Sequence, residues 1–242
     1  MNQKIFSGKT DIGRKRSNNE DQFIIHPKLE FCVAADGMGG AAAGEIASSI
    51  FVETALEVFK DPFKRSENEV LFHVKKAFSL ANEKILAHIN KNPNHEGMGC
   101  TAELLAFYDD GFVLGHVGDS RTYLLRGNHL RQITQDHTLV QQQVEESIIS
   151  PDRAKNHPLR NVILRALGQK RELAVDLLRG KIFSRDLFLL CSDGLTDMVG
   201  DDQIEELLLS NLDIETKAKK LVETANNAGG ADNITAVLVT IQ

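Results

Sequence analysis

Hydrophobic residues occur along the chain in short runs of two kinds. One kind is uniformly apolar and ends at a turn, which predicts buried β-strands. Turn residues at 109–111 (Asp-Asp-Gly) and at 127–128 (Gly-Asn) each separate two such runs, and each predicts a β-hairpin. Closely spaced hairpins indicate antiparallel sheets rather than repeated parallel units. The predicted strands are 31–35, 104–108, 112–117, 121–125, 129–133, 173–178, 187–191 and 234–241.

The other kind of run repeats with the period of an α-helix. In the segments 43–59 and 68–89, hydrophobic side chains recur every three or four residues, which predicts two long, consecutive, antiparallel helices. Two more helices are predicted near the end, at 202–209 and 214–227. Strands in the middle of the chain, with helix pairs before and after them, predict a layered sandwich with sheets inside and helices outside.

A length of 242 residues favours one domain covering residues 1–242. The segment 137–168 is different, because it is polar, mixed in charge and only weakly periodic. We call it the flap segment and expect it to be a mobile flap beside the functional site. Within it, Ser150-Pro151-Asp152 has the features of a helix start.

Composition excludes several classes of protein. Hydrophobic residues make up 42% and charged residues 26%, so broad disorder is not expected. The net charge of −6 offers no basic stripe for nucleic acid and suits a protein that gathers cations. No apolar run is long enough to span a bilayer, and the first residues lack the apolar core of a signal peptide, so we expect a cytoplasmic protein without membrane contact. Cys32, Cys100 and Cys191 are expected to be buried, reduced thiols.

Four aspartates share a sequence context. Asp36, Asp119 and Asp193 each follow an apolar strand, and Asp232 precedes the last one. Strand ends of a sandwich converge along one edge, where carboxylates would repel one another and resist burial. A hard divalent cation removes both penalties, because Mg²⁺ and Mn²⁺ prefer oxygen ligands. One such aspartate is better explained as a turn residue, but four at strand edges predict a metal site.

Near the N-terminus, residues 13–21 mix basic and acidic side chains. The Arg16 guanidinium in this segment is suited to holding a phosphate through paired hydrogen bonds. Taken alone, the segment is better explained as a solvated cluster of charges.

Taken together, these motifs resemble the ordered motif set of the type 2C, metal-dependent serine/threonine protein phosphatases, in the form found in small bacterial members. The resemblance extends from about residue 7 to residue 241. An Asp-Gly pair alone is uninformative, but five motifs in one order are highly specific. They are Arg16-x-x-x-Glu20-Asp21, Asp36-Gly37-Met38-Gly39-Gly40, Gly118-Asp119-Ser120-Arg121, Ser192-Asp193-Gly194 and Asp232-Asn233-Ile234-Thr235.

The resemblance implies a set of metal ligands. Asp36 would bridge two Mn²⁺ or Mg²⁺ ions, and the carbonyl of Gly37 would complete the first ion. Asp193 and Asp232 would hold the second ion. Asp119, with Asp193, would match a third, weaker metal position. Ligand type alone does not separate Mn²⁺ from Mg²⁺.

The resemblance also implies a fold, a substrate and a reaction. Glu20 would act through metal-bound water, with Asp21 close behind it, and Arg16 would bind the substrate phosphate. Together with Asp36, Asp193 and Asp232, Arg16 completes the implied catalytic set. The fold would be an α+β, four-layer α-β-β-α sandwich with two central antiparallel sheets flanked by helix pairs.

Two cations that share a water lower its pKa and make a hydroxide that attacks phosphorus in line. The resemblance implies that this chemistry hydrolyses phosphoserine and phosphothreonine in proteins, and we expect the enzyme to be a monomer. We expect the enzyme to act in signalling and to oppose a serine/threonine kinase.

The sequence departs from the family pattern at the proton donor for the leaving group. Eukaryotic relatives place a histidine where this chain has Met38, and many bacterial relatives have one where it has Ala41. A metal-bound water, or His137 or His157 from the flap segment, is the alternative donor. For both histidines a structural or solvated role is the better interpretation. General acid catalysis contributes typically 10²–10⁴-fold, so its loss would slow turnover without abolishing it.

Two other functions stay open from the sequence. A weakly active pseudophosphatase that binds phosphoproteins is favoured only by Ala41. A hydrolase of small phosphate esters would use the same aspartates.

Several other polar residues are expected to have structural roles. His116 is expected to be a satisfied core histidine, and Arg121 to pair with a nearby carboxylate. Lys217, Lys219 and Lys220 are expected to form a solvated helix face.

Overall fold

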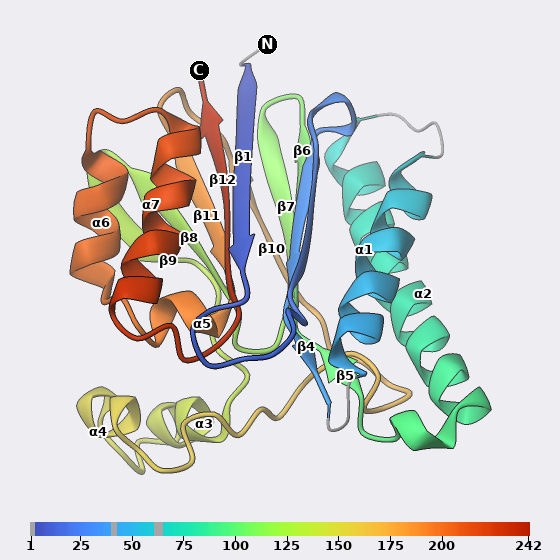
Figure 1. Ribbon diagram of the computed structural model, residues 1–242. Coiled ribbons are helices and arrows are strands. Elements are labelled where there is room, and N and C mark those ends of the chain that lie inside the picture. Colours follow the sequence, from blue (N-terminus) through green and yellow to red (C-terminus); the bar gives the residue numbers. More distant parts are fainter. Residues whose placement is uncertain (1–2, 40–42, 61–64) are drawn as a thin grey trace.

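The computed structural model describes residues 3–39, 43–60 and 65–242. Two five-stranded sheets pack face to face, and helices cover their outer faces (Figure 1). Every strand pairing in both sheets is antiparallel. The arrangement is therefore the predicted four-layer α-β-β-α sandwich of the α+β class.

Each sheet is assembled from strands that are distant in sequence. The first has the order β1-β12-β11-β8-β9, and the second has the order β10-β7-β6-β3-β2. The strands of the first are Lys4–Asp11, Ile234–Ile241, Leu187–Cys191, Arg121–Arg126 and His129–Gln132. Those of the second are Asp176–Lys181, Gly111–Val117, Ala102–Tyr108, Phe31–Ala35 and Gln22–His26. A separate short ribbon pairs β4 (Gly37–Met38) with β5 (Gly99–Cys100).

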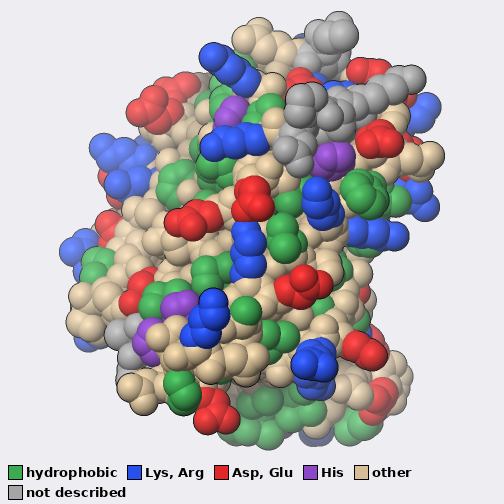
Figure 2. All heavy atoms as spheres, turned by 90° about the vertical axis from the view of Figure 1, so that its right-hand side faces the viewer, with side chains coloured by type: hydrophobic (Ala, Val, Ile, Leu, Met, Phe, Trp, Pro, Cys, Tyr) green, Lys and Arg blue, Asp and Glu red, His purple; other side chains and the backbone are tan. Residues whose placement is uncertain are grey.

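Helices cover each sheet as amphipathic layers. The long helices α1 (Gly44–Lys60) and α2 (Glu67–Lys91) lie on the second sheet. Figure 2 shows this side of the molecule, on which basic and acidic side chains are interspersed. On the first sheet lie α6 (Asp201–Leu209), α7 (Ile214–Asn227) and the short α5 (Asp193–Thr196). The flap segment contains α3 (Leu139–Glu145) and α4 (Pro151–Lys155), which lie beyond one end of the sandwich (Figure 1).

Burial on both faces explains why the central strands are continuously apolar. Along β12, Val237 and Val239 point between the sheets, whereas Ala236 and Leu238 point toward the helix layer. Because successive side chains of a strand alternate between its faces, a strand covered on both sides needs no polar positions. This is the pattern that made β12 recognisable from sequence.

The predicted elements are largely confirmed, and the errors lie at sheet edges. Strands 31–35, 187–191 and 234–241 have the predicted bounds, and both hairpins and all four long helices are present. The strand predicted at 173–178 was misplaced, because β10 runs from Asp176 to Lys181. Strands β1 and β2 were missed. All three are edge strands with mostly half-buried side chains, so their hydrophobic pattern is weak.

Candidate active site

Acidic side chains from both sheets meet at the end of the sandwich where α5 and β4 lie (Figure 1). Asp36 directly follows β3, Asp119 lies two residues after β7, Asp193 is the first residue of α5, and Asp232 lies two residues before β12. Asp21, just before β2, is buried beside them. The structure thus brings together five carboxylates that are spread over more than 200 positions of the chain.

The electrostatics at Asp36 show how closely the carboxylates are grouped. Burial raises the pKa of Asp36 well above its usual range, and the charges of Asp21, Asp193, Asp119 and Asp232 raise it further. Each of these groups opposes ionisation of the others, because like charges in a poorly solvated place repel strongly. Without a compensating positive charge, such a cluster is unfavourable at neutral pH.

Ionisation of Asp193 and of Asp119 is opposed in the same way. Burial, followed by the charges of Asp119 and Asp232, raises the pKa of Asp193 well above its usual range. Burial and the neighbouring Asp136 raise the pKa of Asp119 to about 7. One buried carboxylate oxygen of Asp119 and one of Asp193 have no hydrogen-bond partner among the described residues, and the same holds for Asp21. Buried oxygens without partners, crowded by other carboxylates, fit a site for a hard divalent cation.

The side chains are not preassembled around such a cation. Within the described residues, no group of three or more His, Cys, Asp or Glu side chains is arranged to hold a metal ion. Asp232 is turned toward Arg16, whose Nη2 donates to its Oδ2 at 2.6 Å. Burial alone would lower the pKa of Arg16, but Asp232, Glu20 and Asp36 raise it. Arg16 therefore lies at the edge of the carboxylate cluster.

Gly37 and Glu20 are held together by backbone packing. The carbonyl of Glu20 accepts from the Gly37 N–H at 3.2 Å and from Ser48 Oγ at 2.6 Å. A Cβ on Gly37 would lie 2.3 Å from the carbonyl oxygen of Gly44. A Cβ on Gly44 would lie 2.5 Å from Glu20 Oε2 and 2.8 Å from the Gly37 carbonyl oxygen. Only glycines allow this approach, which places the Glu20 carboxylate and the Gly37 carbonyl beside the same residue.

Gly194 has a similar role next to Asp193. A Cβ at Gly194 would lie 2.0 Å from the carbonyl oxygen of Asn233, a distance that no real structure tolerates. Glycine therefore lets α5 begin directly against the segment that carries Asp232. The Asp-Gly pair at 193–194 is needed for backbone contact between two chain segments, in addition to any contact with a ligand.

The segment that carries Arg16 is anchored by Asn233, a role that the sequence analysis did not assign. The Nδ2 of Asn233 donates to the carbonyls of Ile12 at 3.0 Å and Asn18 at 2.9 Å. Its Oδ1 accepts from the Glu20 N–H at 2.8 Å. Asn233 thereby ties both sides of the Arg16 turn to the start of β12. Its place beside Asp232, in the last motif, was the signal available in the sequence.

Hydroxyl groups orient the inner carboxylates, and these residues were also missed. Asp21 Oδ2 accepts from Ser192 Oγ and from Thr235 Oγ1, both at 2.7 Å. Burial raises the pKa of Asp21 to about 6 although these bonds oppose the rise. The backbone of Asp36 is fixed in the same way, because its N–H donates to Thr101 Oγ1 at 3.2 Å. Ser192 and Thr235 stand within the quoted motifs, whereas Thr101 has no such signal.

His137 has a structural position at the start of the flap segment. Its Nδ1 accepts from the Gly118 N–H at 3.0 Å, so the proton of the neutral ring is on Nε2, which faces Asp176 Oδ2 at 3.2 Å. Burial and the positive charge of His116 lower the pKa of His137 to about 4. Both nitrogens are engaged, so His137 is not a free proton donor. His157 is half-buried, and its Nδ1 accepts from the Leu159 N–H at 3.2 Å.

At the motif after Asp36, Met38 lies near Gln169, whose Nε2 is 3.9 Å from the Met38 sulfur. Gly40, the last residue of that motif, lies outside the described residues, and so does Ala41, on which part of the proton-donor argument rested.

The predictions for the remaining polar residues are mostly confirmed. His116 is buried against Glu103, and its Nε2 lies 2.9 Å from the carbonyl oxygen of Gln135. Arg121 binds Asp136 through three hydrogen bonds of 2.7–3.1 Å. The prediction for Lys217 was wrong, because it is buried on α7 and its Nζ donates to the carbonyl of Leu208 at 2.6 Å. Lys219 and Lys220 are exposed as predicted, and the three cysteines are free and buried.

The sequence of this chain is similar to those of known phosphatases. The family model described as protein phosphatase 2C matches residues 10–238. Protein phosphatase PhpP of Streptococcus pneumoniae is 37% identical over 235 residues, which cover 96% of this chain and 95% of that protein.

Two crystal structures of the serine/threonine phosphatase PstP, the first from Mycobacterium tuberculosis, are also similar. The first superposes with a TM-score of 0.93 at 36% identity and covers 100% of both chains. The second, the PstP catalytic domain in complex with two manganese ions, has a TM-score of 0.90 at 35% identity and covers 100% of this chain and 99% of that one.

Proposed function

Given that this chain belongs to the protein phosphatase 2C family and is a metal-dependent serine/threonine protein phosphatase, we propose that Asp36, Asp193 and Asp232 hold two catalytic cations. The carbonyl of Gly37 completes the first site, and Glu20 acts through water. The orphaned oxygen of Asp193 and the mutual repulsion at Asp36 support this assignment. The manganese ions bound to the similar PstP domain make Mn²⁺ the first cation to test.

A third and weaker cation site is proposed at Asp119, together with Asp193. Asp119 has a buried oxygen with no hydrogen-bond partner in the described part of the chain, and its charge raises the pKa of Asp193. These are the features expected of two carboxylates that share a cation.

When bound, divalent cations would neutralise charge on the phosphoryl group and would lower the pKa of a water, so that the water could lose a proton and attack phosphorus near neutral pH. The chain's own contribution is positioning. The Arg16 side chain is 48% exposed, and we assign to it an exchange of Asp232 for the substrate phosphate, to which a guanidinium donates paired hydrogen bonds. Asn233 limits the movement of the Arg16 turn during that exchange. Asp21, held by two hydroxyls, adds negative charge behind the cluster.

The leaving oxygen of serine or threonine needs a proton, and we assign its delivery to water. Met38 carries no exchangeable proton, and His137 is fixed by Gly118 and Asp176. A His157→Ala variant is then expected to retain the wild-type kcat, measured on a phosphothreonine peptide. A fall of tenfold or more would assign the proton to His157 instead, since general acid catalysis contributes about 10²–10⁴-fold.

The physiological substrates are proposed to be phosphoproteins made by a serine/threonine kinase of the same cell. This assignment follows from the reaction, because an enzyme that removes phosphate from serine and threonine acts after one that adds it. None of the described helices combines the length and apolar character needed to cross a bilayer. The cytoplasmic location and the monomeric state stay predictions from the sequence.

One observation carries the metal assignment: carboxylates from both sheets meet, buried and incompletely bonded, at a single edge. The test combines isothermal titration with Mn²⁺ and hydrolysis of a phosphothreonine peptide by the wild type, Asp36→Asn and Asp193→Asn. We expect two or three Mn²⁺ per wild-type chain, and a loss of both high-affinity binding and turnover in each variant. Asp152→Asn, an exposed change in α4, is the matched control. Full Mn²⁺ binding by both site variants would refute the ligand assignment.

A further inference from the structure

Lys217 on α7 is a buried lysine that no carboxylate neutralises. The residue is 9% exposed, and its Nζ donates to the carbonyl of Leu208 at 2.6 Å. It forms no ion pair in the described part of the chain, whereas the exposed Lys219 on the same helix lies 3.9 Å from Glu223. Burial lowers the pKa of Lys217, and no neighbouring charge opposes that change. Buried charges in proteins are normally paired, so this lysine requires an explanation.

A cap on the preceding helix explains part of this arrangement. The carbonyl of Leu208 lies in the last turn of α6, where a positive charge is favourable. A lysine ammonium carries three N–H donors, and the bond to Leu208 uses one of them. The other two have no acceptor among the described residues. Lys217 can therefore still bind an anion.

Lys217 lines a pocket at the end of the sandwich opposite to the carboxylate cluster, which we call the Lys217 pocket. Its volume of about 500 Å³ lies in the range of about 300–1,000 Å³ that is usual for small-molecule sites. Leu187 begins β11 and Ile241 ends β12, and the opposite ends of these two strands lie next to Asp193 and Asp232 (Figure 1). The apolar walls are aliphatic and are formed by Leu125, Leu187, Leu208, Leu209 and Ile241.

The charged side chains of the Lys217 pocket are both positive. Among the described residues that line it, only Lys217 and Arg185 carry charged side chains, in a chain whose net charge is −6. Arg185 is exposed and forms no ion pair with a described residue. Its backbone has a φ of 74°, in the left-handed region that favours glycine, so the local backbone does not explain an arginine here. Both cations face a ligand without competing carboxylate side chains.

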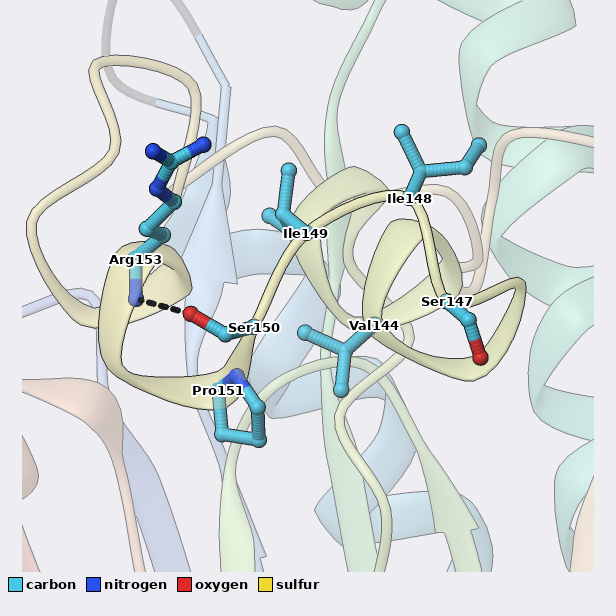
Figure 3. Close-up of a pocket in the computed structure, with 7 residues that line it drawn as sticks. All are labelled: Val144, Ser147, Ile148, Ile149, Ser150, Pro151 and Arg153. Atoms are coloured by element: carbon cyan, nitrogen blue, oxygen red, sulfur yellow. Dashed lines mark hydrogen bonds between the residues drawn. The ribbon is translucent and has the colours of Figure 1, made fainter.

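The pocket between α3 and α4 in the flap segment lacks this combination. Its one charged side chain among the described lining residues, Arg153, is exposed, and the backbone N–H of that residue donates to Ser150 Oγ at 3.4 Å (Figure 3). Water and salt screen an exposed cation, so it does not require a partner. A cation buried beside apolar walls differs, because pairing with an anion offsets part of the cost of its burial.

We propose that the Lys217 pocket binds a small organic carboxylate with an aliphatic body. The carboxylate accepts hydrogen bonds from Lys217 and pairs with Arg185. The hydrocarbon chain lies against the aliphatic walls, where its burial is favourable. This site is separate from the catalytic carboxylates, so the inference does not depend on the proposed function.

The test is isothermal titration of the whole chain with octanoate, a simple probe of this chemistry, at neutral pH in EDTA. The EDTA prevents a divalent cation at Asp36 or Asp193 from holding the carboxylate. We expect octanoate to saturate a single site and to raise the temperature of unfolding, as a ligand of the folded state does. Octanol lacks the charge and acetate lacks the chain, so each is expected to bind at least about tenfold more weakly.

Two variants locate the site. Lys217→Met keeps an apolar stem of similar length without the charge, and it is expected to weaken octanoate binding at least about tenfold while leaving octanol binding unchanged. Lys219→Met, an exposed change on the same helix, is the matched control and should bind octanoate as the wild type does. Arg185→Gly suits the left-handed backbone and should weaken octanoate binding about threefold, as for an exposed ion pair.

The inference is overturned if octanoate shows no saturable binding, or if octanol or acetate binds as tightly as octanoate. Wild-type octanoate affinity in Lys217→Met would also overturn it, because the anion would then bind elsewhere on the protein. If circular dichroism shows that Lys217→Met does not fold, Arg185→Gly decides in its place, and unchanged octanoate binding by that folded variant would overturn the inference.

Discussion

Replacing Asp119 with Asn is expected to stabilise the metal-free protein above pH 7. Asp119 is 7% exposed, one of its carboxylate oxygens has no partner among the described residues, and burial with the charge of Asp136 raises its pKa to about 7. The ionised side chain is therefore held in an unfavourable place whenever no cation is bound. An amide of the same shape has no charge to bury and finds acceptors in the surrounding carboxylates.

The sign and the size of the effect follow from proton linkage. Because the pKa of Asp119 is higher in the folded chain than its ordinary value of 3.8, the folded state keeps a proton that the unfolded state has released. The wild type therefore loses stability as pH rises from about 4 to about 7, and the loss is complete above that. A pKa raised by roughly three corresponds to a loss of about 4 kcal/mol in the free energy of unfolding. Because the carboxylates titrate together, we expect a measured difference between the two proteins that changes by about 2–3 kcal/mol between pH 4.5 and pH 8.

The measurement is urea unfolding of both proteins in EDTA at pH 4.5 and at pH 8, followed by circular dichroism. The free energy of unfolding of Asp119→Asn should exceed that of the wild type at pH 8, and the difference should shrink at pH 4.5. Asp152→Asn, exposed in α4, should change the free energy of unfolding by less than about 0.5 kcal/mol at both pH values. A variant less stable than wild type at pH 8, or a difference independent of pH, would refute the reasoning.

Three further substitutions test the structural parts of the site. Asn233→Ala removes three hydrogen bonds and should lower the free energy of unfolding by about 3 kcal/mol in urea, whereas the exposed Asn227→Ala should have little effect. Gly194→Ala places a Cβ 2.0 Å from the Asn233 carbonyl oxygen, so it should lower the free energy of unfolding by about 2 kcal/mol and weaken Mn²⁺ binding in calorimetry. Gly200→Ala, at a position where an added Cβ meets open space, should do neither. His116→Gln should lower the free energy of unfolding by about 3–5 kcal/mol in thermal unfolding, because the buried Glu103 loses its charged partner and keeps the Thr122 hydroxyl. The double change with Glu103→Gln should recover part of the loss. Equal unfolding of each test and control pair would contradict the corresponding assignment.

The sequence by itself determined the central strands, the helix pairs and the candidate ligands. Strands 187–191 and 234–241 are apolar throughout because both faces are covered, so the pattern alone located them. The carboxylates at Asp36, Asp119, Asp193 and Asp232 were recognisable because each interrupts or borders such a run. Features that depend on residue type and on local periodicity can therefore be predicted without a structure.

Only the tertiary structure decided which residues hold the site in place. The bonds from Asn233 to Ile12, and from Ser192 to Asp21, join positions that are 221 and 171 residues apart, and no local pattern reports such contacts. Lys217 is buried for the same reason: the carbonyl of Leu208 on the neighbouring helix accepts from it, although its own helix has a polar surface. Contacts between distant segments depend on how the sheets and helices pack, and this packing is absent from the order of residues along the chain.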